Sequence, residues 1–516
     1  MPRVSRQRRL ALALLASCLA VGNAAVGAVA RESLPVGDAA GAADDLNIAE
    51  TSAVSSHWVG IFHRRSIRYT ASAARLAIPG PSGTPDAQLF YVAYTADGIA
   101  ADRRPVTFLM NGGPGSATAW LHLGGLGPKK IVLDQIGVPP PPPARLEDNP
   151  LSPLDRTDLV FIDAPGTGYS RVASDDAKSR LFQRDGDLQA FATFIKRYLS
   201  ETKRWSSPVY LFGESYGGTR AAGLCDVLVR QGVPLSGVVL LSSALDFGLN
   251  EPSLTNDLPY VMLVPSYAIV AAYHGKTDRS LPKQPSALIR AAQLWAAGDY
   301  ARALARGNRL SLQERARVAR GLFQFIGIAP PVIEAANLRV DVQTFQKYLL
   351  ADRGVVGGRV DGRLSGPQTM NAADEPWYDP AMGALTPAYS AAAEQLLGQV
   401  LGYHAGIPYR MYSRDVASHF VLAPAEKFPN LGYPETLSAL QTAAVKNQHF
   451  KILVLGGIYD LAAPFWTTEY EMDHLPMTPS FRRNISIVRL TAGHMAYDDR
   501  DGLRQMSDAL GRFYGR

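Results

Sequence analysis

The chain has 516 residues, of which 47% are hydrophobic and 19% are charged. This length allows a large buried core, and no internal apolar run of about 18 residues marks a membrane span. The formal net charge is +6, but basic residues are not interleaved with aromatic ones in a stripe, so nucleic-acid binding is not expected. Since the length exceeds that of a usual domain, we expect one large domain with an insertion, or two domains.

The first 30 residues have the pattern of a secretory signal. Four Arg precede an apolar run from Leu10 to about Val21, and Ala28-Val29-Ala30 fits a small-x-small cleavage site. We therefore expect a cleaved signal over residues 1–30 and a periplasmic or secreted protein. A membrane anchor is one alternative. Another is a lipid anchor at Cys18, whose preceding residues resemble a lipoprotein box, although the apolar residues after Cys18 disfavour it.

Removal of the signal would change both the charge and the cysteine content. The first 30 residues carry four Arg and no acid, so a chain beginning at Arg31 has a net charge of +2. Only one of the two cysteines, Cys225, would remain, which excludes an internal disulfide. A domain of this size buries enough surface to fold without disulfides. The composition is therefore compatible with export.

The predicted elements begin after residues 31–50, which are small and acidic and are expected to form a disordered leader. Alternating stretches at Ser66–Thr70 and Gln88–Tyr94 predict antiparallel strands. Four brief apolar runs then have the character of buried parallel strands, and these are Pro105–Met110, Asp158–Asp163, Val209–Phe212 and Gly237–Leu241. Helical spacing at Asp185–Lys203 and Tyr216–Arg230 completes the pattern of a mostly parallel sheet with helices on both faces.

The strand pattern stops after about Asn250, and residues 251–445 show helical segments and loops. The clearest helical patterns are Ser286–Ala305, Ser311–Ile326 and Pro387–Leu401. Gly354–Gly366 is rich in Gly and Arg and is expected to be a loop connector. We expect residues 251–445 to be a helical insertion that forms a cap over the carboxyl ends of the sheet, where α/β folds bind ligands.

The buried-strand pattern resumes near residue 446. Ile452–Leu455 and Ile485–Leu490 are predicted strands, and Leu503–Tyr514 is a predicted helix. The α/β core is therefore expected in two parts of the chain, residues 51–250 and residues 446–516. The insertion separates these two parts in sequence but not in the predicted fold.

Ser215 lies in the segment Gly213-Glu214-Ser215-Tyr216-Gly217, between a predicted strand and a predicted helix. This is the Gly-x-Ser-x-Gly pattern of a nucleophile elbow, a turn so sharp that the serine backbone is strained and its hydroxyl projects above the sheet edge. The following helix adds the positive end of its dipole. A plain strand-to-helix loop is the alternative, but the flanking strand and helix favour a nucleophile at Ser215.

A catalytic serine needs a general base, and the base needs an acid that orients it. In such sheets the acid and the His follow later strands, in the order Ser, acid, His. Asp460 and His494 follow the last two predicted strands in that order. Asp246 is the rival acid, since it follows an earlier strand. Asp460 is preferred because it ends the strand just before the one that carries His494.

Acyl transfer also needs donors aimed at the developing oxyanion. The glycine loop Asn111-Gly112-Gly113-Pro114-Gly115 follows an early strand, where this fold has half of its oxyanion hole, and the residue after the serine supplies the other half. We therefore assign the backbone N–H groups of Gly113 and Tyr216 as oxyanion donors. A plain tight turn is the alternative for the glycine loop. His122, which lies near the loop, is a candidate pocket-lining residue.

Taken in order, these motifs resemble the serine carboxypeptidase family. The matching segments are Asn111–Gly115, Leu126-Gly127-Pro128, Asn149-Pro150, Asp163–Ser170, Gly213–Gly218, Asp460 and Gly493-His494. The resemblance covers about residues 105–250 and 445–500, and the insertion matches only in position. It implies the α/β-hydrolase fold and release of C-terminal residues from peptides, often at acid pH. The composition, rich in Ala, Arg and Gly, and the export signal together indicate an exported bacterial member.

The resemblance also implies a site for the terminal carboxylate of the substrate. In the family, the Asn of the glycine motif, a neighbouring backbone N–H and the Glu before the serine bind it, which corresponds here to Asn111, Gly112 and Glu214. A proton shared between the Glu and the substrate carboxylate replaces repulsion with a hydrogen bond, so binding is best in acid. Two positions depart from the family: Leu109 stands where a Trp is frequent, and Gly125 where a second Glu braces the network.

Three functions fit these residues. The first is a serine-type carboxypeptidase acting on peptides with a free C-terminus. The second is an exported esterase or acyltransferase with the same triad, because fold and triad do not fix the acceptor or the leaving group. The third is a non-catalytic binding protein on this scaffold. No metal or cofactor is expected, since neither a His-Glu-x-x-His motif nor paired Cys spacing occurs.

Overall fold

The computed structural model describes residues 51–368, 378–422 and 434–515 of the chain. The predicted signal over residues 1–30, which includes Cys18, and the predicted leader over residues 31–50 lie outside the described residues. Among the helices in the described ranges, none combines the length and the apolar character needed to cross a bilayer.

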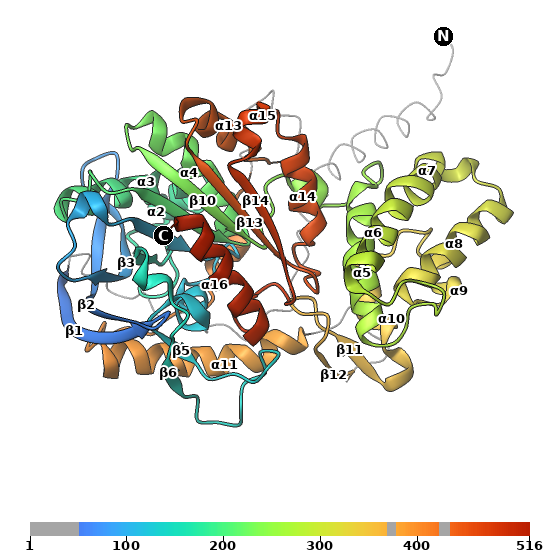
Figure 1. Ribbon diagram of the computed structural model, residues 1–516, viewed down its shortest axis with the longest axis horizontal. Helices are drawn as coiled ribbons and strands as arrows, with labels where there is room; N and C mark the ends of the chain where they lie inside the picture. The colour runs from blue at the N-terminus through green and yellow to red at the C-terminus, as the bar shows by residue number, and fades with distance from the viewer. Residues whose placement is uncertain (1–50, 369–377, 423–433, 516) are drawn as a thin grey trace, which may run out of the picture.

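One mixed sheet runs through the centre of the molecule (Figure 1). Its strands are β1 (Thr51–Phe62), β2 (Arg65–Pro79), β3 (Pro85–Ala96), β4 (Val106–Met110), β7 (Asp158–Ile162), β8 (Arg171–Val172), β9 (Val209–Glu214), β10 (Leu235–Leu241), β13 (Lys451–Gly457) and β14 (Ile485–Leu490). Their order is β1-β2-β3-β7-β4-β9-β10-β13-β14, with β8 pairing β3. β1, β2, β3 and β7 pair antiparallel, and β7, β4, β9, β10, β13 and β14 pair parallel. These six parallel strands are the six predicted buried runs, so the mostly parallel sheet is confirmed.

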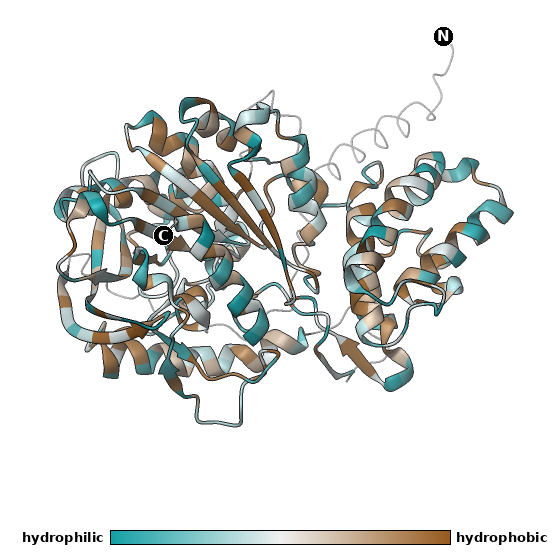
Figure 2. Cartoon of the chain, in the orientation of Figure 1, coloured by the Kyte–Doolittle hydropathy of each residue, from teal (hydrophilic) through white to brown (hydrophobic). Residues whose placement is uncertain are grey.

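Helices cover both faces of the parallel strands. α3 (Arg184–Glu201), α4 (Tyr216–Arg230) and α13 (Leu437–Lys446) share one core with Val238 and Leu240 of β10. α16 (Arg500–Tyr514) shares the other core with Val239 and Leu241. Alternate residues of one strand thus enter opposite cores, because successive side chains of a strand point to opposite faces. The central strands, such as β10 and β13, are accordingly mostly apolar along their length, as Figure 2 shows. Cys225 of α4 is a free buried thiol.

The region between β10 and β13 is mainly helical. Its elements are α5 (Leu258–Tyr273), α6 (Pro285–Trp295), α7 (Ala301–Arg306), α8 (Leu312–Ile326), α9 (Pro330–Ala335), α10 (Val342–Leu349), β11 (Val355–Gly357), β12 (Ser365–Pro367), α11 (Pro380–Glu394) and α12 (Arg414–His419). α5 to α10 form a separate lobe beside the sheet (Figure 1), with a core of its own that also takes in Ile458, Leu461 and Phe465 from beyond β13. This lobe therefore packs directly on the segment that contains Asp460.

Shorter elements complete the chain. They are α1 (Ala119–Leu121), β5 (Lys129–Ile131), β6 (Leu146–Asp148), α2 (Asp175–Leu181), α14 (Phe465–His474) and α15 (Pro479–Arg482). β5, β6 and β8 were not predicted from the sequence, and neither were two further features. β1 is an edge strand whose Val59 and Ile61 are 67% and 65% exposed, so it lacks a clear buried face. β11 and β12 pair antiparallel within the segment expected to be pure loop.

Candidate active site

Ser215 occupies the turn between β9 and α4 with φ 57° and ψ −129°, a strained conformation for a residue with a side chain. Its N–H donates to the Leu241 carbonyl at 3.0 Å, which holds the turn against β10. A Cβ atom at Gly213 would lie 1.9 Å from the Gly217 carbonyl oxygen, so the turn closes only with glycine there. Ser215 is partly exposed while its two neighbours are buried, which presents the serine at the carboxyl edge of the sheet.

Asp460 and His494 lie together at the ends of the neighbouring strands β13 and β14. His494 Nδ1 is 2.8 Å from Asp460 Oδ2, and both residues are buried. Asp460 Oδ1 accepts the N–H groups of Ala462 and Ala463 at 2.7 and 2.9 Å, which fixes the carboxylate. Burial alone would lower the pKa of His494, but the charge and hydrogen bond of Asp460 outweigh it and raise that pKa. This carboxylate therefore orients the imidazole and stabilises its charged form.

Ser242 lies between the serine turn and the histidine loop, which is the segment 491–499 that joins β14 to α16. Its Oγ donates to the His494 carbonyl at 2.9 Å, and its N–H donates to the Leu455 carbonyl at 2.8 Å. Ser242 directly follows Leu241, which accepts the Ser215 N–H. Within the described residues the Ser215 hydroxyl has no hydrogen bond to His494. The segment Leu241–Ser242 instead holds the backbones of Ser215 and His494 at the same edge of the sheet. The rival acid, Asp246, instead accepts the Gly248 N–H at 2.8 Å.

Asn111 is held in one orientation beside the serine. Its Oδ1 accepts the Leu121 N–H at 3.0 Å, which leaves Nδ2 to donate to Glu214 Oε2 at 2.6 Å. Its backbone carbonyl accepts Arg220 Nη1 at 2.7 Å, and Arg220 is itself paired with the buried Asp187. An Asn amide with a fixed carbonyl keeps one further N–H free for a ligand.

The glycine loop packs directly against the serine turn. A Cβ at Gly112 would lie 2.5 Å from Tyr216 N and 2.8 Å from the Glu214 carbonyl, so only glycine allows this approach. Gly113 is exposed with φ 101°, and its N–H has no hydrogen bond within the described residues. Tyr216 is the first residue of α4, where a backbone N–H has no partner inside the helix. Both N–H groups are therefore available to a bound anion.

Glu214 is buried next to the serine, with 2% of its surface exposed. Its Oε2 accepts two hydrogen bonds, one from Asn111 and one from the Tyr497 hydroxyl at 2.7 Å. Burial raises the pKa of Glu214 to about 7, although the positive charge of His494 and these hydrogen bonds lower it in part. Near neutral pH this carboxyl therefore exchanges a proton, which an ordinary surface Glu does not.

Tyr497 is the site residue that the sequence did not reveal. A Cβ at Gly124 would lie 2.0 Å from the Tyr497 ring, and one at Gly125 would lie 2.5 Å from Leu503 and 3.0 Å from Tyr497 Cβ. A second Glu at Gly125 thus has no room, and the Tyr497 hydroxyl contacts Glu214 instead. The only sequence signal was its position three residues after His494. Leu109, the other departure, is buried in the sheet core.

The buried network continues behind Tyr497. The Tyr389 hydroxyl on α11 donates a short hydrogen bond to Asp498 Oδ1, and burial raises the pKa of Asp498 well above its ordinary range. His122, the candidate pocket residue, is instead buried, bonded to the Tyr94 hydroxyl at 2.7 Å and stacked on Phe161. Burial lowers its pKa to about 3, so His122 is a neutral core residue.

The chain is similar in part to serine carboxypeptidases. Residues 81–244 match the serine carboxypeptidase family (Peptidase_S10). This match takes in the glycine loop and Ser215, while Asp460 and His494 lie beyond it. A serine carboxypeptidase S10 family member of Dictyostelium discoideum is 26% identical over 221 residues, covering 42% of this chain and 48% of that protein. The retinoid-inducible serine carboxypeptidase of Rattus norvegicus is 32% identical over 146 residues, covering 27% and 28%. The chain thus spans about half the length of the first relative and less of the second.

A solved structure extends the likeness to the whole fold. The crystal structure of Kex1(delta)p, a prohormone-processing carboxypeptidase from Saccharomyces cerevisiae, has a TM-score of 0.52 at 16% identity, covering 85% of this chain and 90% of that one. At this identity the likeness concerns the fold alone. Together with the sheet order, it confirms the predicted α/β-hydrolase fold.

Proposed function

We propose that the chain is a serine-type carboxypeptidase in which Ser215 is the nucleophile, His494 the base and Asp460 the orienting acid. The strained turn at Ser215, the His494–Asp460 hydrogen bond and the similarity to serine carboxypeptidases support this proposal. The observation that favours a carboxypeptidase over other hydrolases is the buried pair of Asn111 and Glu214, joined at 2.6 Å beside the serine.

In the proposed reaction, His494 takes the proton of the Ser215 hydroxyl as Oγ attacks the carbonyl carbon of the last peptide bond. The N–H groups of Gly113 and Tyr216 donate to the resulting oxyanion. The imidazolium then gives its proton to the departing nitrogen, the C–N bond breaks, and the C-terminal amino acid leaves an ester on Ser215. Water then attacks this ester as it gives a proton to His494. His494 returns that proton to the Ser215 oxygen as the ester C–O bond breaks and the shortened peptide is released.

The terminal carboxylate of the substrate would be bound by Asn111, Gly112 and Glu214. Asn111 offers its second amide proton, Gly112 offers its backbone N–H, and protonated Glu214 offers an O–H donor. Because both Asn111 and Tyr497 donate to Oε2 of Glu214, Oε1 is the oxygen left to carry that proton. The raised pKa of Glu214 keeps it protonated in acid, which supports binding of a free-acid substrate at acid pH.

The decisive comparison uses a blocked dipeptide and its C-terminal amide. We expect faster hydrolysis of the free acid at pH about 5, where Glu214 is protonated. Equal rates for the acid and the amide, or hydrolysis of esters only, would identify an esterase or acyltransferase. Ser215→Ala should remove labelling by a fluorophosphonate and lower hydrolysis by about 10⁴- to 10⁶-fold, while the exposed Ser206→Ala is the matched control. A wild type that is not labelled would indicate a non-catalytic binding protein.

We also propose that the protein is an exported bacterial enzyme, periplasmic or secreted, with residues 1–30 as its cleaved signal. The cluster of four Arg, the apolar run and the small-x-small site support this. N-terminal sequencing of protein recovered from the cell envelope and medium tests it. A chain beginning at Arg31 supports cleavage, whereas an acylated Cys18 at the N-terminus would support a lipid anchor.

A further inference from the structure

The segment 358–364 between β11 and β12, called the connector below, contacts the loops that contain Asp460 and His494. The His494 N–H donates to the Val360 carbonyl at 2.7 Å, and the Leu461 N–H donates to the Arg359 carbonyl at 3.0 Å. The Gly362 N–H donates to the Tyr459 carbonyl at 3.0 Å. Backbone groups of the connector therefore bind His494 itself and both neighbours of Asp460.

Gly493 makes this close approach sterically feasible. A Cβ at Gly493 would lie 2.6 Å from the Val360 carbonyl oxygen and 2.6 Å from Asp361 Cβ. These contacts involve a backbone carbonyl and the Cβ atom of Asp361, neither of which can move without a shift of the backbone. The histidine loop and the connector are thus fitted to each other at van der Waals distance.

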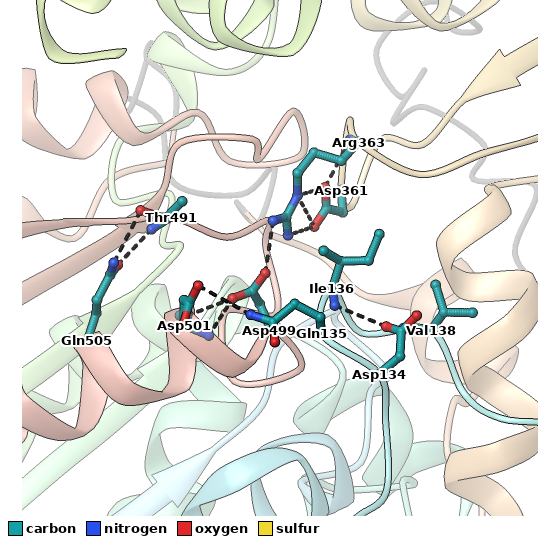
Figure 3. A network of polar contacts seen from close by, with 11 residues as sticks. Asp134, Gln135, Ile136, Val138, Asp361, Arg363, Thr491, Asp499, Asp501 and Gln505 are labelled. Atoms are coloured by element: carbon teal, nitrogen blue, oxygen red, sulfur yellow. Dashed lines mark hydrogen bonds and ion pairs between the residues drawn. The ribbon is translucent and has the colours of Figure 1, made fainter. Parts of the chain in front are cut away.

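Arg363 ties the connector to the start of α16, as Figure 3 shows. Its Nη2 is 2.5 Å from Asp361 Oδ2, and its Nη1 is 2.8 Å from Asp499 Oδ2. The guanidinium also lies over the Tyr459 ring, with Cζ 4.6 Å from the ring centroid. Its side chain is only 5% exposed, so a planar cation is held between two carboxylates and an aromatic face with little contact with water.

Asp499 connects Arg363 to the segment that contains both His494 and Tyr497. Its Oδ1 accepts the N–H groups of Asp501 and Gly502 at 2.8 and 2.7 Å and so caps α16. The segment between His494 and Asp499 contains Tyr497, which donates to Glu214. Arg363 therefore holds Asp499, at one end of the segment 494–499, and His494 lies at the other end.

The helical lobe also reaches this connector. His274 Nε2, at the end of α5, is 2.8 Å from the Gly362 carbonyl oxygen. The Arg359 N–H donates to Asp379 Oδ2 at 2.5 Å, and Asp379 caps α11. Elements from both ends of the insertion thus hold the connector in place against the histidine loop.

We infer that Arg363 is a positioning residue that sets the orientation of His494 toward Asp460 by clamping the connector between the insertion and α16. This inference rests on the proposed catalytic roles of His494 and Asp460. Arg363 is too deeply bound to two carboxylates to contact substrate itself, so its influence is on the rate of the chemical step. Loss of the clamp does not remove the contacts of the serine turn or the Asn111–Glu214 hydrogen bond, which belong to other segments. It reaches Glu214 indirectly, through Tyr497, so we expect a smaller effect on KM than on kcat.

The kinetic test compares Arg363→Met and Arg363→Lys with the wild type. We expect kcat and the rate of fluorophosphonate labelling to fall together, by about 100-fold in Arg363→Met and about 10-fold in Arg363→Lys, with KM changed less than about twofold. Lysine keeps the charge but not the bidentate fork, so it rescues in part. Because Arg363→Met leaves two buried carboxylates without a cation, Arg363→Lys decides the question when Arg363→Met does not fold.

Arg104→Met is the matched control, since Arg104 is also a buried guanidinium, paired with Asp158 at 2.8 Å at the opposite end of the parallel strands. We expect it to lower the melting temperature without changing kcat. Wild-type kcat and labelling rates in folded Arg363→Lys would overturn the inference. A wild type that is labelled but does not release C-terminal residues would refute the proposed carboxypeptidase and leave this inference standing.

A spectroscopic measurement tests the clamp without any reaction. The Nδ1 proton shared by His494 and Asp460 should give a low-field proton NMR resonance in acid, which disappears in Asp460→Asn. We expect this resonance to broaden or shift upfield in Arg363→Lys and to stay unchanged in Arg104→Met. An unchanged resonance in Arg363→Lys would show that the imidazole keeps its orientation without the clamp, and the inference would be wrong.

Discussion

The Tyr497 hydroxyl donates a hydrogen bond to Glu214 Oε2 at 2.7 Å, although the two residues are 283 positions apart in the sequence. Tyr497 reaches Glu214 from the histidine loop, and its ring packs against Gly124 and Gly125, where a side chain would collide with it. The proposed carboxylate-binding residue is thus braced by the same loop that supplies the proposed base. Changes at Tyr497 itself should therefore affect substrate binding, whereas changes that displace His494 should affect the chemical step.

Glu214→Gln should abolish the pH dependence of substrate binding. The pKa of Glu214 is raised from 4.5 to about 7, so its O–H donor is present in acid and is lost as pH rises through about 7. We expect the KM of the wild type for a free-acid peptide to rise above that pH, by up to about tenfold per pH unit. Gln keeps a neutral donor at all pH values. Measurement of KM from pH 4.5 to 8.5 checks this, and parallel profiles for the two proteins would contradict it.

Tyr497→Phe should move the same profile toward higher pH. The Tyr497 hydroxyl stabilises the ionised form of Glu214 and lowers its pKa, so its removal should raise the midpoint of the KM profile. A hydrogen bond to a charged group is worth about 1.5 kcal/mol or more, which corresponds to about one pH unit. Tyr389→Phe, which loses only the bond to Asp498, is the control. A midpoint that stays at the wild-type value would count against the role of Tyr497.

Asp460→Asn should lower kcat by about 10⁴-fold with little change in KM, because an amide cannot hold the imidazole in the required tautomer and charge state. Asp246→Asn is the matched control, since its carboxylate only caps the Gly248 N–H. We expect that variant to retain kcat within about twofold. A steady-state comparison on one peptide separates the two carboxylates, and the reverse order of effects would make Asp246 the catalytic acid.

Glu471→Gln should stabilise the protein in base. Glu471 is buried, its Oε1 accepts the N–H groups of Leu245 and Asp246, and burial raises its pKa from 4.5 to about 8. A raised pKa means that its contribution to stability is present below pH 4.5 and is lost as pH rises through about 8. Relative to Glu471→Gln, the wild type should lose roughly 1.4 kcal/mol per pH unit in this window.

Urea unfolding at pH 5 and pH 8.5 measures this difference. Glu469→Gln is the control, because Glu469 lies on the same helix as Glu471, α14, but is ion-paired with Arg489 of β14 and lies nearer the surface. We expect its free energy of unfolding to follow the wild type at both pH values. An equal pH dependence for Glu471→Gln and the wild type would mean that Glu471 is not buried as an acid.

The parallel strands could be predicted because each is short, mostly apolar and followed within a few residues by a polar or glycine residue. The same pattern placed Ser215, Asp460 and His494 at strand ends, where a parallel sheet brings them to one edge. Local sequence was sufficient there because each residue follows the end of its own strand within a few positions. The hydrogen bond between Asp460 and His494 follows from the pairing of β13 with β14.

The contacts that surround these residues could not be predicted in the same way. Tyr497 contacts Glu214, and Val360 contacts His494, across long stretches of chain. Gly354–Gly366 has the composition of a mobile loop, yet Arg363 within it is buried between two carboxylates. The composition of a segment describes only its own residues. This segment is held in place by residues of other elements, which its composition does not reveal.

β13 and β14, the last two strands of the sheet, have a consequence for the timing of activity during synthesis. The proposed nucleophile at Ser215 emerges from the ribosome about 245 residues before Asp460 and about 279 before His494. Until the final strands add to the edge formed by β10, the serine has neither base nor acid. A growing chain, or one truncated before residue 450, would therefore lack the proposed base and acid and would have no activity of the proposed kind.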